Sequence, residues 1–353
     1  MKLKKLSGIY IIFVAPWTFR SMGCFSYTHI FKEGKNIMAK RAVPRASRNV
    51  ASTFNLVIKD FRRNKFKYFI ILPVLVYIFI FSYKPMYGVV IAFQRFKPFL
   101  GIADSPWIGF DNFKQFFNDI YFRRLLTNTF TISIKSIIFG FPAPIIFALL
   151  LNEIKNNKFK RTVQTISYMP HFISIVVIAG LLRAFSQTDG VFNDIITYFG
   201  GNRTNLLSVK ENFHPIYIIS GIWQNIGWDS IIYLAALAGI DQEQYEAARV
   251  DGAGRLKQML YITLPGLVPT ITTLFILRMG GILNVGYEKI LLLYQPLTYE
   301  VADVISTYVY RKGIVEANYS FSAAVGLFNS IVNVCFLLTT NKISKKISEN
   351  SLF

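Results

Sequence analysis

The sequence predicts an all-α integral membrane protein, built as a bundle of six transmembrane helices with one structured loop on the cytoplasmic side. Of its 353 residues, 53% are hydrophobic and only 16% are charged, and the apolar residues stand in long runs. A soluble helix keeps one polar face in water, whereas a charge at the centre of a bilayer is costly. Charges that collect between apolar runs therefore indicate a chain dissolved in lipid.

A helix needs about 20 mostly apolar residues to cross a bilayer. Six segments meet this requirement with at most one Asp, Glu, Lys or Arg in each. The expected spans are 68–83, 125–151, 162–182, 215–240, 267–287 and 321–340. The first is short, but Lys67 and Lys84 flank it, and their long side chains can reach the membrane interface.

The distribution of Lys and Arg predicts the orientation, because these residues are retained on the cytoplasmic side. With the N-terminus inside, segments 31–67, 152–161, 241–265 and 341–353 hold 21 of them, and the outside segments 84–124, 186–213 and 288–320 hold 11. We therefore expect a multi-pass protein of the bacterial cytoplasmic membrane with both termini cytoplasmic. The net charge of +20 arises between apolar runs, so it indicates membrane lipid as a partner and no nucleic acid.

Three regions follow from this reading. Residues 1–60 form a basic N-terminal cytoplasmic tail, residues 61–345 the six-helix transmembrane domain, and residues 346–353 a short C-terminal tail. Within the first region, the apolar stretch Gly8–Trp17 is short for a signal sequence and has no convincing cleavage site. We expect residues 1–37 to be disordered or to precede the true start, and a seventh span here is the alternative.

The loop between the fourth and fifth spans, residues 241–265, is the most structured of the inside segments. Asp241 is a good N-cap for a short helix that ends at Val250, and glycines at 252 and 254 allow a sharp elbow before a second helix over Arg255–Ile262. Neither helix is long enough to be stable alone in water. They either dock into a groove on another protein or pack against the spans of this chain.

The residues Glu246-Ala247-Ala248, Asp251-Gly252-Ala253 and Leu264-Pro265 resemble the EAA loop of permease subunits in type I ATP-binding cassette importers. The resemblance covers roughly residues 60–350. In that family the loop is a coupling helix seated in a cleft of the ATPase subunit. The resemblance implies that the ATPase-coupling residues are Tyr245, Glu246, Ala247, Ala248, Asp251, Gly252 and Ala253.

The sequence around this loop resembles the carbohydrate-uptake branch of the family, and within that branch the lipoprotein and polysaccharide permeases. The matching segments are Tyr168–Ser174, Trp228–Leu237 and Gly286–Ile290. This resemblance implies the inward movement of oligosaccharides or polysaccharide fragments by alternating access. It also implies the partners: a second homologous permease subunit, a cytoplasmic ATPase dimer, an extracellular substrate-binding lipoprotein and the saccharide.

The chain has no phosphate-binding G-x-x-x-x-G-K-[ST] loop, and no HExxH or G-x-S-x-G motif. We therefore expect a transport subunit, not an enzyme, with no cofactor or metal of its own; ATP and Mg²⁺ would bind the partner ATPase. A stand-alone secondary transporter is the alternative, but it would need several intramembrane acids. A membrane-embedded glycosyltransferase, the second alternative, would need clustered carboxylates.

Polar residues within the spans are candidates for the substrate path, because a polar group in hydrocarbon needs a partner or a function. Those in the fourth span are Trp223, Gln224, Asn225, Trp228 and Asp229, and those near the end of the fifth are Arg278, Asn284 and Tyr287. Aromatic faces beside amides suit sugars. The alternative is that the amides bond across helices and Asp229 pairs with Arg278 or Lys135.

Overall fold

The computed structural model describes residues 60–347, 351 and 352, and these residues are helical with no strand. The expected all-α class is confirmed for this part of the chain. The longer α-helices are α3 (Lys65–Ile78), α6 (Phe122–Lys135), α7 (Pro142–Glu153), α8 (Asn157–Tyr168), α9 (Ile175–Ser186), α11 (Lys210–Leu237), α14 (Leu264–Met279) and α18 (Tyr319–Ile347). The shorter ones are α4 (Lys84–Met86), α5 (Asp111–Phe117), α10 (Val191–Tyr198), α12 (Gln242–Val250), α13 (Arg255–Gln258), α15 (Tyr287–Leu293), α16 (Tyr299–Ala302) and α17 (Ile305–Tyr310).

The chain divides into two compact units, one up to Val89 and one from Val90 onward. The first unit contributes α3 and α4, and α3 has no buried residue. A helix that is apolar around its whole circumference is typical of a membrane span. Residues 1–37, for which the sequence leaves disorder or an unused start open, lie outside the described residues.

Five helical segments of the described chain are long and apolar enough to cross a membrane: Lys65–Phe93, Phe122–Glu153, Ile175–Tyr198, Arg255–Met279 and Tyr319–Lys346. Four of them overlap most of an expected span, whereas Ile175–Tyr198 shares only residues 175–182 with the expected third span. The expected fourth span lies in α11, a single helix of 28 residues. It is long enough, but its amides and its acid lower its hydropathy, so the count of six stays a prediction.

The expected third span, 162–182, is not one helix. It is divided into α8 and α9 by a tight turn at Met169–Phe172 and an extended residue, Ile173. Pro170 has no N–H to donate to the preceding turn, and Ser174 caps α9 by accepting a hydrogen bond from the N–H of Val177 at 3.3 Å. The break therefore has a local cause, and it places a non-helical segment against α11.

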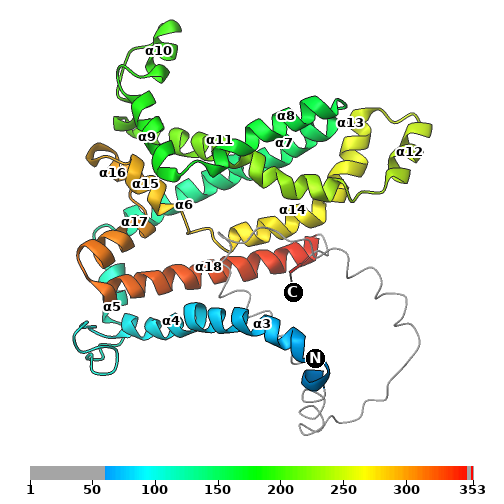
Figure 1. Ribbon diagram of the computed structural model, residues 1–353. Coiled ribbons are helices and arrows are strands. Elements are labelled where there is room, and N and C mark those ends of the chain that lie inside the picture. Colours follow the sequence, from blue (N-terminus) through cyan, green and yellow to red (C-terminus); the bar gives the residue numbers. More distant parts are fainter. Residues whose placement is uncertain (1–59, 348–350, 353) are drawn as a thin grey trace. The chain divides into compact units, whose positions relative to one another are not determined.

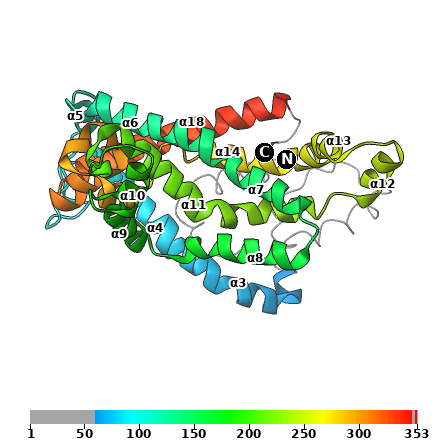
Figure 2. The ribbon, with the colours of Figure 1, turned by 90° about the horizontal axis from the view of Figure 1, so that it is seen from above.

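Within the second unit, α11 is the central helix and packs against α7, α8 and α14 (Figures 1 and 2). Its approach to α8 is close at Gly227, where a Cβ atom would lie 2.3 Å from the carbonyl oxygen of Ser167. No side chain fits at that distance. Gly227 is therefore required by the contact between two backbones and not by its conformation.

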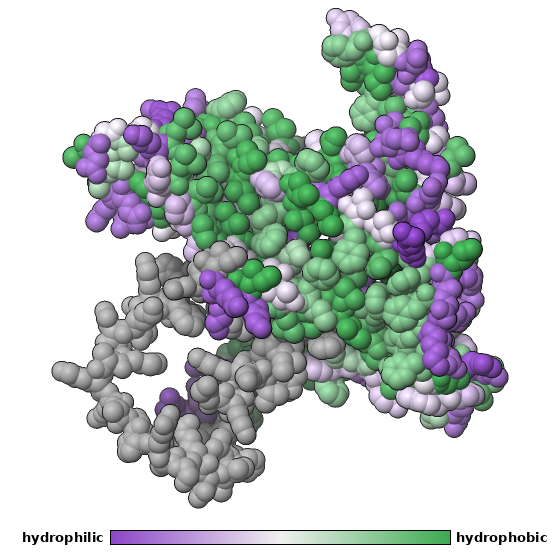
Figure 3. Space-filling model, turned by 180° about the vertical axis from the view of Figure 1, so that it is seen from behind, coloured by the Kyte–Doolittle hydropathy of each residue, from purple (hydrophilic) through white to green (hydrophobic). Residues whose placement is uncertain are grey.

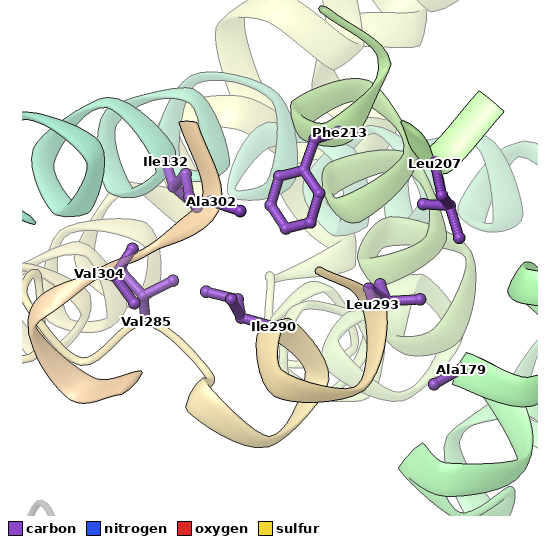
Figure 4. Close-up of a cluster of buried hydrophobic side chains, with 9 residues drawn as sticks. All are labelled: Ile132, Ala179, Leu207, Phe213, Val285, Ile290, Leu293, Ala302 and Val304. Atoms are coloured by element: carbon purple, nitrogen blue, oxygen red, sulfur yellow. The ribbon is translucent and has the colours of Figure 1, made fainter. Parts of the chain in front are cut away.

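The apolar core lies in clusters at different levels of the bundle. One cluster joins α6, α9, α11 and α15 through Ile132, Ala179, Phe213 and Ile290, among others (Figure 4). Another lies near the opposite end of α11, around Tyr233, Leu237 and Leu267. The polar stretch of α11, residues 223–229, falls between these two layers. Apolar packing on both sides of this stretch therefore fixes its position in the bundle.

The surface follows the same division. On the face shown in Figure 3, hydrophobic residues gather over the middle of the helices and hydrophilic residues gather toward the two ends. Figures 1 and 2 agree that α12 and α13 lie at one end of the second unit, while α15, α16 and α17 lie at the other. This is the arrangement of a membrane bundle, with an apolar belt in the lipid and two polar ends in water.

An ionic network holds the end formed by α16 and α17. Asp303, whose side chain is only 1% exposed, pairs with Arg311 at 2.8 Å and Arg124 at 3.5 Å. It also accepts a hydrogen bond from the Thr307 hydroxyl at 2.8 Å. Two cations thus face one buried carboxylate, which ties α6 and the segment after α17 to the loop before α17.

Replacement of Gly227 by Ala should destabilise the bundle by about 1–3 kcal/mol, because the new methyl group must displace the α8 backbone. The measurement is the thermal unfolding midpoint of the protein purified in detergent. Gly326→Ala in α18 is the matched control, since its added Cβ meets no atom within 4 Å. Equal midpoints for Gly227→Ala and the unchanged protein would contradict the close contact.

Candidate functional site

The hairpin formed by α12 and α13 has the local geometry that the sequence predicts. The Asp241 side chain caps α12 by accepting a hydrogen bond from the N–H of Glu243 at 3.0 Å. Gly252 ends the helix with a φ of +74°, in the left-handed region that favours glycine. Gly254 precedes α13 with an ordinary φ of −68°. Gly252 is therefore the residue on which the elbow depends.

The second helix of this hairpin differs from the expectation. It does not end at Ile262 before a separate span, because α13 continues through a π-helical segment, Met259–Thr263, into α14. Pro265 lacks the N–H that a regular turn would use, and the wider π turn accommodates this. The helical path from Arg255 to Met279 is thus unbroken.

The outer surface of the hairpin is exposed, and α12 has no buried residue. Val250 is 89% exposed, and Leu256 and Tyr261 on the following helix are 71% and 78% exposed. Only one polar contact ties α12 to the start of the next span: the hydroxyls of Tyr245 and Thr263 are 2.9 Å apart. The hairpin therefore presents apolar side chains that this chain leaves uncovered, beside the exposed Glu246 and Ala247.

The polar stretch of α11 meets the turn between α8 and α9. His171 stacks on Trp228 with ring centroids 4.6 Å apart, and its Nδ1 lies 3.0 Å from Asn225 Oδ1. Phe172 packs edge-on against the same indole at 5.4 Å. These contacts give His171 a structural role, because the imidazole holds two of the predicted path residues in place.

The remaining residues of this stretch have different surroundings. The Gln224 amide lies 3.5 Å from the Ile173 carbonyl oxygen, and Trp223 is 49% exposed. Both amides thus contact the turn between α8 and α9, and Asn225 also donates to the Gly221 carbonyl oxygen within α11 at 3.0 Å. Among the described residues, no ion pair joins Asp229 to Arg278 or Lys135, and Lys135 instead lies 3.0 Å from His214 Nδ1. The expected pairing is absent there, and Asp229 is exposed.

After α14 the chain runs through a non-helical segment, residues 280–286, before α15. Side chains from three other helices satisfy its backbone. The hydroxyls of Ser133 and Ser306 donate to the carbonyls of Ile282 and Val285, and Asn333 accepts from the N–H of Leu283 at 3.0 Å. Non-helical backbone within a membrane protein is tolerated only with such partners or beside water.

Two of the predicted path residues lie here: Asn284 in this segment and Tyr287, the first residue of α15. Asn284 is exposed, and its Oδ1 accepts hydrogen bonds from the amides of Asn329 and Asn333 in α18. Tyr287 is 39% exposed and stacks on Tyr310 at 5.9 Å. The sequence interpretation misses Asn329 and Asn333. They lie in an apolar run without charges, and the average hydropathy of that run conceals two amides.

Lys289, in α15 just after this segment, links it to α11. It is 7% exposed, and its Nζ donates to the Tyr217 carbonyl oxygen at 3.0 Å. Burial lowers the pKa of Lys289 to about 8. The lysine therefore remains mostly protonated at neutral pH and brings a positive charge to the region between α11 and the broken segment.

Residues 140–349 match the model of a protein family described as the binding-protein-dependent transport system inner membrane component. The match spans more than half of the chain and includes the hairpin, the polar stretch of α11 and the broken segment. The chain belongs to this family. It is an integral protein of the cytoplasmic membrane and a permease subunit of an ATP-binding cassette importer.

The permease is similar to protein LplB of Bacillus subtilis, with 45% identity over 293 residues that cover 83% of this chain and 92% of that one. It is also similar to YteP of the same organism, a polygalacturonan/rhamnogalacturonan transport system permease protein, with 42% identity over 292 residues, 82% of this chain and 91% of that one. Both relatives are matched over nearly their whole length.

Two solved structures have the same fold. One is a bacterial ABC transporter involved in the import of the acidic polysaccharide alginate; the TM-score is 0.77 and the identity 46%, covering 83% of this chain and 99% of that one. The other is a bacterial alginate ABC transporter in complex with an alginate pentasaccharide-bound periplasmic protein, with a TM-score of 0.76 and 44% identity. The expected family and importer type are confirmed.

Among the residues that the structure describes, no group of three or more His, Cys, Asp or Glu side chains is arranged to hold a metal ion. The polar groups of the permease are amides, hydroxyls, aromatic rings and single cations.

Replacement of Tyr245 by Phe should loosen α12, because the hydroxyl contact with Thr263 is the polar link between α12 and the next span. A hydrogen bond of this kind contributes about 0.5–1.5 kcal/mol, so amide hydrogen exchange in α12 should become about twofold to tenfold faster. Tyr261→Phe is the control, because Tyr261 is 78% exposed. Unchanged exchange in α12 of the Tyr245→Phe protein would contradict the anchoring role.

Proposed function

We propose that this permease imports acidic oligosaccharides, fragments of a uronate-containing polysaccharide. The observation that carries the proposal is the 46% identity, over 99% of that chain, to the permease of an importer of the acidic polysaccharide alginate. The name of YteP, a polygalacturonan/rhamnogalacturonan permease, adds a second acidic polymer at 42% identity. Both polymers carry carboxylates on their sugar rings.

The charges of the described residues support an acidic cargo. Arg278 is exposed and has no ion-pair partner within 4.0 Å in the part of the chain that the structure describes. Lys289 adds a buried cation. Carboxylates of a saccharide entering between these groups would meet complementary charge.

The path for the saccharide would run along the polar stretch of α11 and the broken segment after α14. Trp223, Trp228 and Tyr287 offer aromatic faces to the C–H patches of sugar rings. Gln224, Asn225 and Asn284 offer amides to hydroxyl groups, and Asp229 lies beside them. Since Asn225 is held by His171, its role would be to shape the wall.

The hairpin of α12 and α13 would be the site of coupling. Val250, Leu256 and Tyr261 are apolar and uncovered, and such a surface fits a groove on a partner. The coupling residues would be Tyr245, Glu246, Ala247, Ala248, Asp251, Gly252 and Ala253. The partner would be a cytoplasmic ATPase dimer that binds ATP and Mg²⁺, while the permease itself performs no chemical step.

In the membrane, we place six spans within residues 61–345, with α11 as the fourth, both termini in the cytoplasm and residues 1–60 and 346–353 as cytoplasmic tails. The hairpin then lies inside and α15–α17 lie outside, at opposite ends of the unit (Figures 1 and 2). A second homologous permease would complete the path. An extracellular binding lipoprotein would deliver the saccharide to the outer end.

Transport would follow alternating access. ATP binding draws the two ATPase subunits together, and the docked hairpins move with them. The binding energy at that interface biases a membrane element between two arrangements. Gly252 is the flexible point between the docked helix and the span, so its conformation should control how movement is transmitted.

The test is uptake of trigalacturonate into proteoliposomes that contain the permease with its ATPase, second permease and binding protein. Uptake should require both internal ATP and the binding protein. Uptake that proceeds without ATP under an ion gradient would contradict an importer of this type, as would a wild-type complex that moves no trigalacturonate.

Gly252→Val should reduce this uptake by about fivefold to thirtyfold, because an L-residue at a φ of +74° is strained by about 1–2 kcal/mol. Gly254→Ala is the matched control: Gly254 has a φ of −68°, and no atom lies within 4 Å of its added Cβ. Uptake by the control should stay within about twofold of wild type. Normal uptake by Gly252→Val would remove the elbow from the coupling mechanism.

A further inference from the structure

Three asparagines join the broken segment to α18, and one backbone group fixes the orientation of their amides. The N–H of Leu283 donates to Asn333 Oδ1 at 3.0 Å. A backbone N–H can only donate, so the Asn333 atom that faces it is the oxygen. The amide nitrogen of Asn333 is then directed at Asn284 and donates to its Oδ1 at 3.1 Å.

Asn329 reinforces this orientation, because its Nδ2 donates to the same Asn284 oxygen at 3.0 Å. An amide can usually be rotated by 180° without a visible difference. Here two donors converge on one oxygen, so rotation of the Asn284 amide would bring its NH₂ group against two other NH₂ groups. The Oδ1 of Asn284 therefore faces α18, and its NH₂ group faces away.

The burial of the three side chains shows which group is accessible. Asn284 is exposed, whereas Asn333 is 5% exposed and Asn329 is partly buried. A molecule that reaches the broken segment therefore meets the NH₂ group of Asn284, which has two N–H donors and no acceptor. Such a group recognises an acceptor oxygen.

Asn333 has a structural reason to be in α18, because it accepts a hydrogen bond from the backbone N–H of Leu283. Asn329 has no such contact with the backbone of the broken segment in the described part of the chain. In the described part of the chain, the hydrogen bond of the Asn329 side chain goes to Asn284, and its Oδ1 is buried with no hydrogen-bond partner. A buried acceptor without a partner is destabilising, and an amide inside a span has its own cost. The hydrogen bond that Asn329 does make is the one that orients Asn284, so this contact offsets the cost of the buried amide.

We propose that Asn284 binds the saccharide in the path by donating its NH₂ group to a uronate carboxylate oxygen, and that Asn329 and Asn333 are positioning residues that hold the amide in this direction. Tyr287, one turn further and stacked on Tyr310, lies beside it for the sugar ring. Arg278, six residues earlier and exposed, adds positive charge. The inference rests on the proposed import of acidic oligosaccharides.

Asn333→Asp separates positioning from structural support. The new carboxylate can still accept from the N–H of Leu283, so the broken segment keeps that partner. It cannot donate to Asn284, however, and the Asn284 amide should rotate to give its NH₂ group to the carboxylate. Asn284 would then present an oxygen to the path, and an oxygen repels a uronate carboxylate.

The experiment measures trigalacturonate uptake per assembled complex in proteoliposomes with the ATPase, second permease and binding protein. Asn284→Leu and Asn333→Asp should each reduce the rate by about tenfold or more, and Asn329→Leu by about threefold. Asn341→Asp is the matched control, because Asn341 lies two turns further along α18, is 8% exposed and accepts from the N–H of Leu352 at 2.8 Å. Its rate should stay within about twofold of wild type.

The thermal midpoint of each complex provides the second readout. A new carboxylate at a buried position lowers the midpoint in either variant, so a positioning role predicts that Asn333→Asp loses uptake while its midpoint falls no further than that of Asn341→Asp, whereas a purely structural role predicts that its uptake and midpoint both fall below those of that control. Wild-type uptake by Asn284→Leu and Asn333→Asp, or an equal loss in Asn341→Asp, overturns this proposal alone. A wild-type complex that moves no trigalacturonate overturns the proposed function, and this proposal with it.

Discussion

The unbroken helical path from Arg255 to Met279 is the constraint on which the rest of the permease depends. Its 25 residues extend about 38 Å, and it joins the exposed hairpin at one end to the broken segment at the other. A helix is stiff over this length, since backbone hydrogen bonds tie its successive turns together, with Pro265 and Pro269 as the two residues that cannot donate one. A displacement of Arg255 therefore reaches residues 280–286 with no intervening hinge apart from the π turn at Met259–Thr263, and α12 acts on this path through the elbow at Gly252.

The two ends of this path satisfy opposite requirements. At the hairpin, Val250 and its neighbours remain uncovered, which costs free energy in the isolated chain and is relieved by a docked partner. At the broken segment, the free backbone groups are satisfied by Ser133, Ser306 and Asn333. One end is therefore open to another protein, while the other is fixed to three helices of its own bundle. That asymmetry is what a lever between a motor and a binding site requires.

Hydropathy and charge were sufficient to locate four of the membrane-length helices, because burial in lipid acts on every residue of a segment and leaves a strong average signal. The turn at Pro170 and the length of α14 depend instead on single residues and their local geometry. The first helix of the hairpin and its elbow were predictable in detail, since the cap at Asp241 and the turn at Gly252 are local features. The sequence could not define the six-span topology to the same degree, because α11 combines membrane length with polar composition.

The candidate site was predictable only in part, for a physical reason. Trp228 and Asn284 stand out as polar or amphipathic residues in apolar surroundings, but their partners are set by tertiary packing. Nothing in the spacing of Asn329 and Asn333 indicates that both amides converge on Asn284, since α18 approaches the broken segment from 45 and 49 residues further along the chain. The pairing of Asp229 was equally undetermined, because exposure to a path and an ion pair both suit an acid in a span.

The central claim is that α12 is held by a separate ATPase, and site-specific photo-crosslinking tests it most directly. A photoreactive residue at Val250, which is 89% exposed, should form a crosslink to the ATPase in the assembled, transporting complex. The same residue placed at Ala148, which is fully buried, should not. Crosslinks from position 250 that reach only this chain or lipid, in a complex that still imports saccharide, would contradict the account.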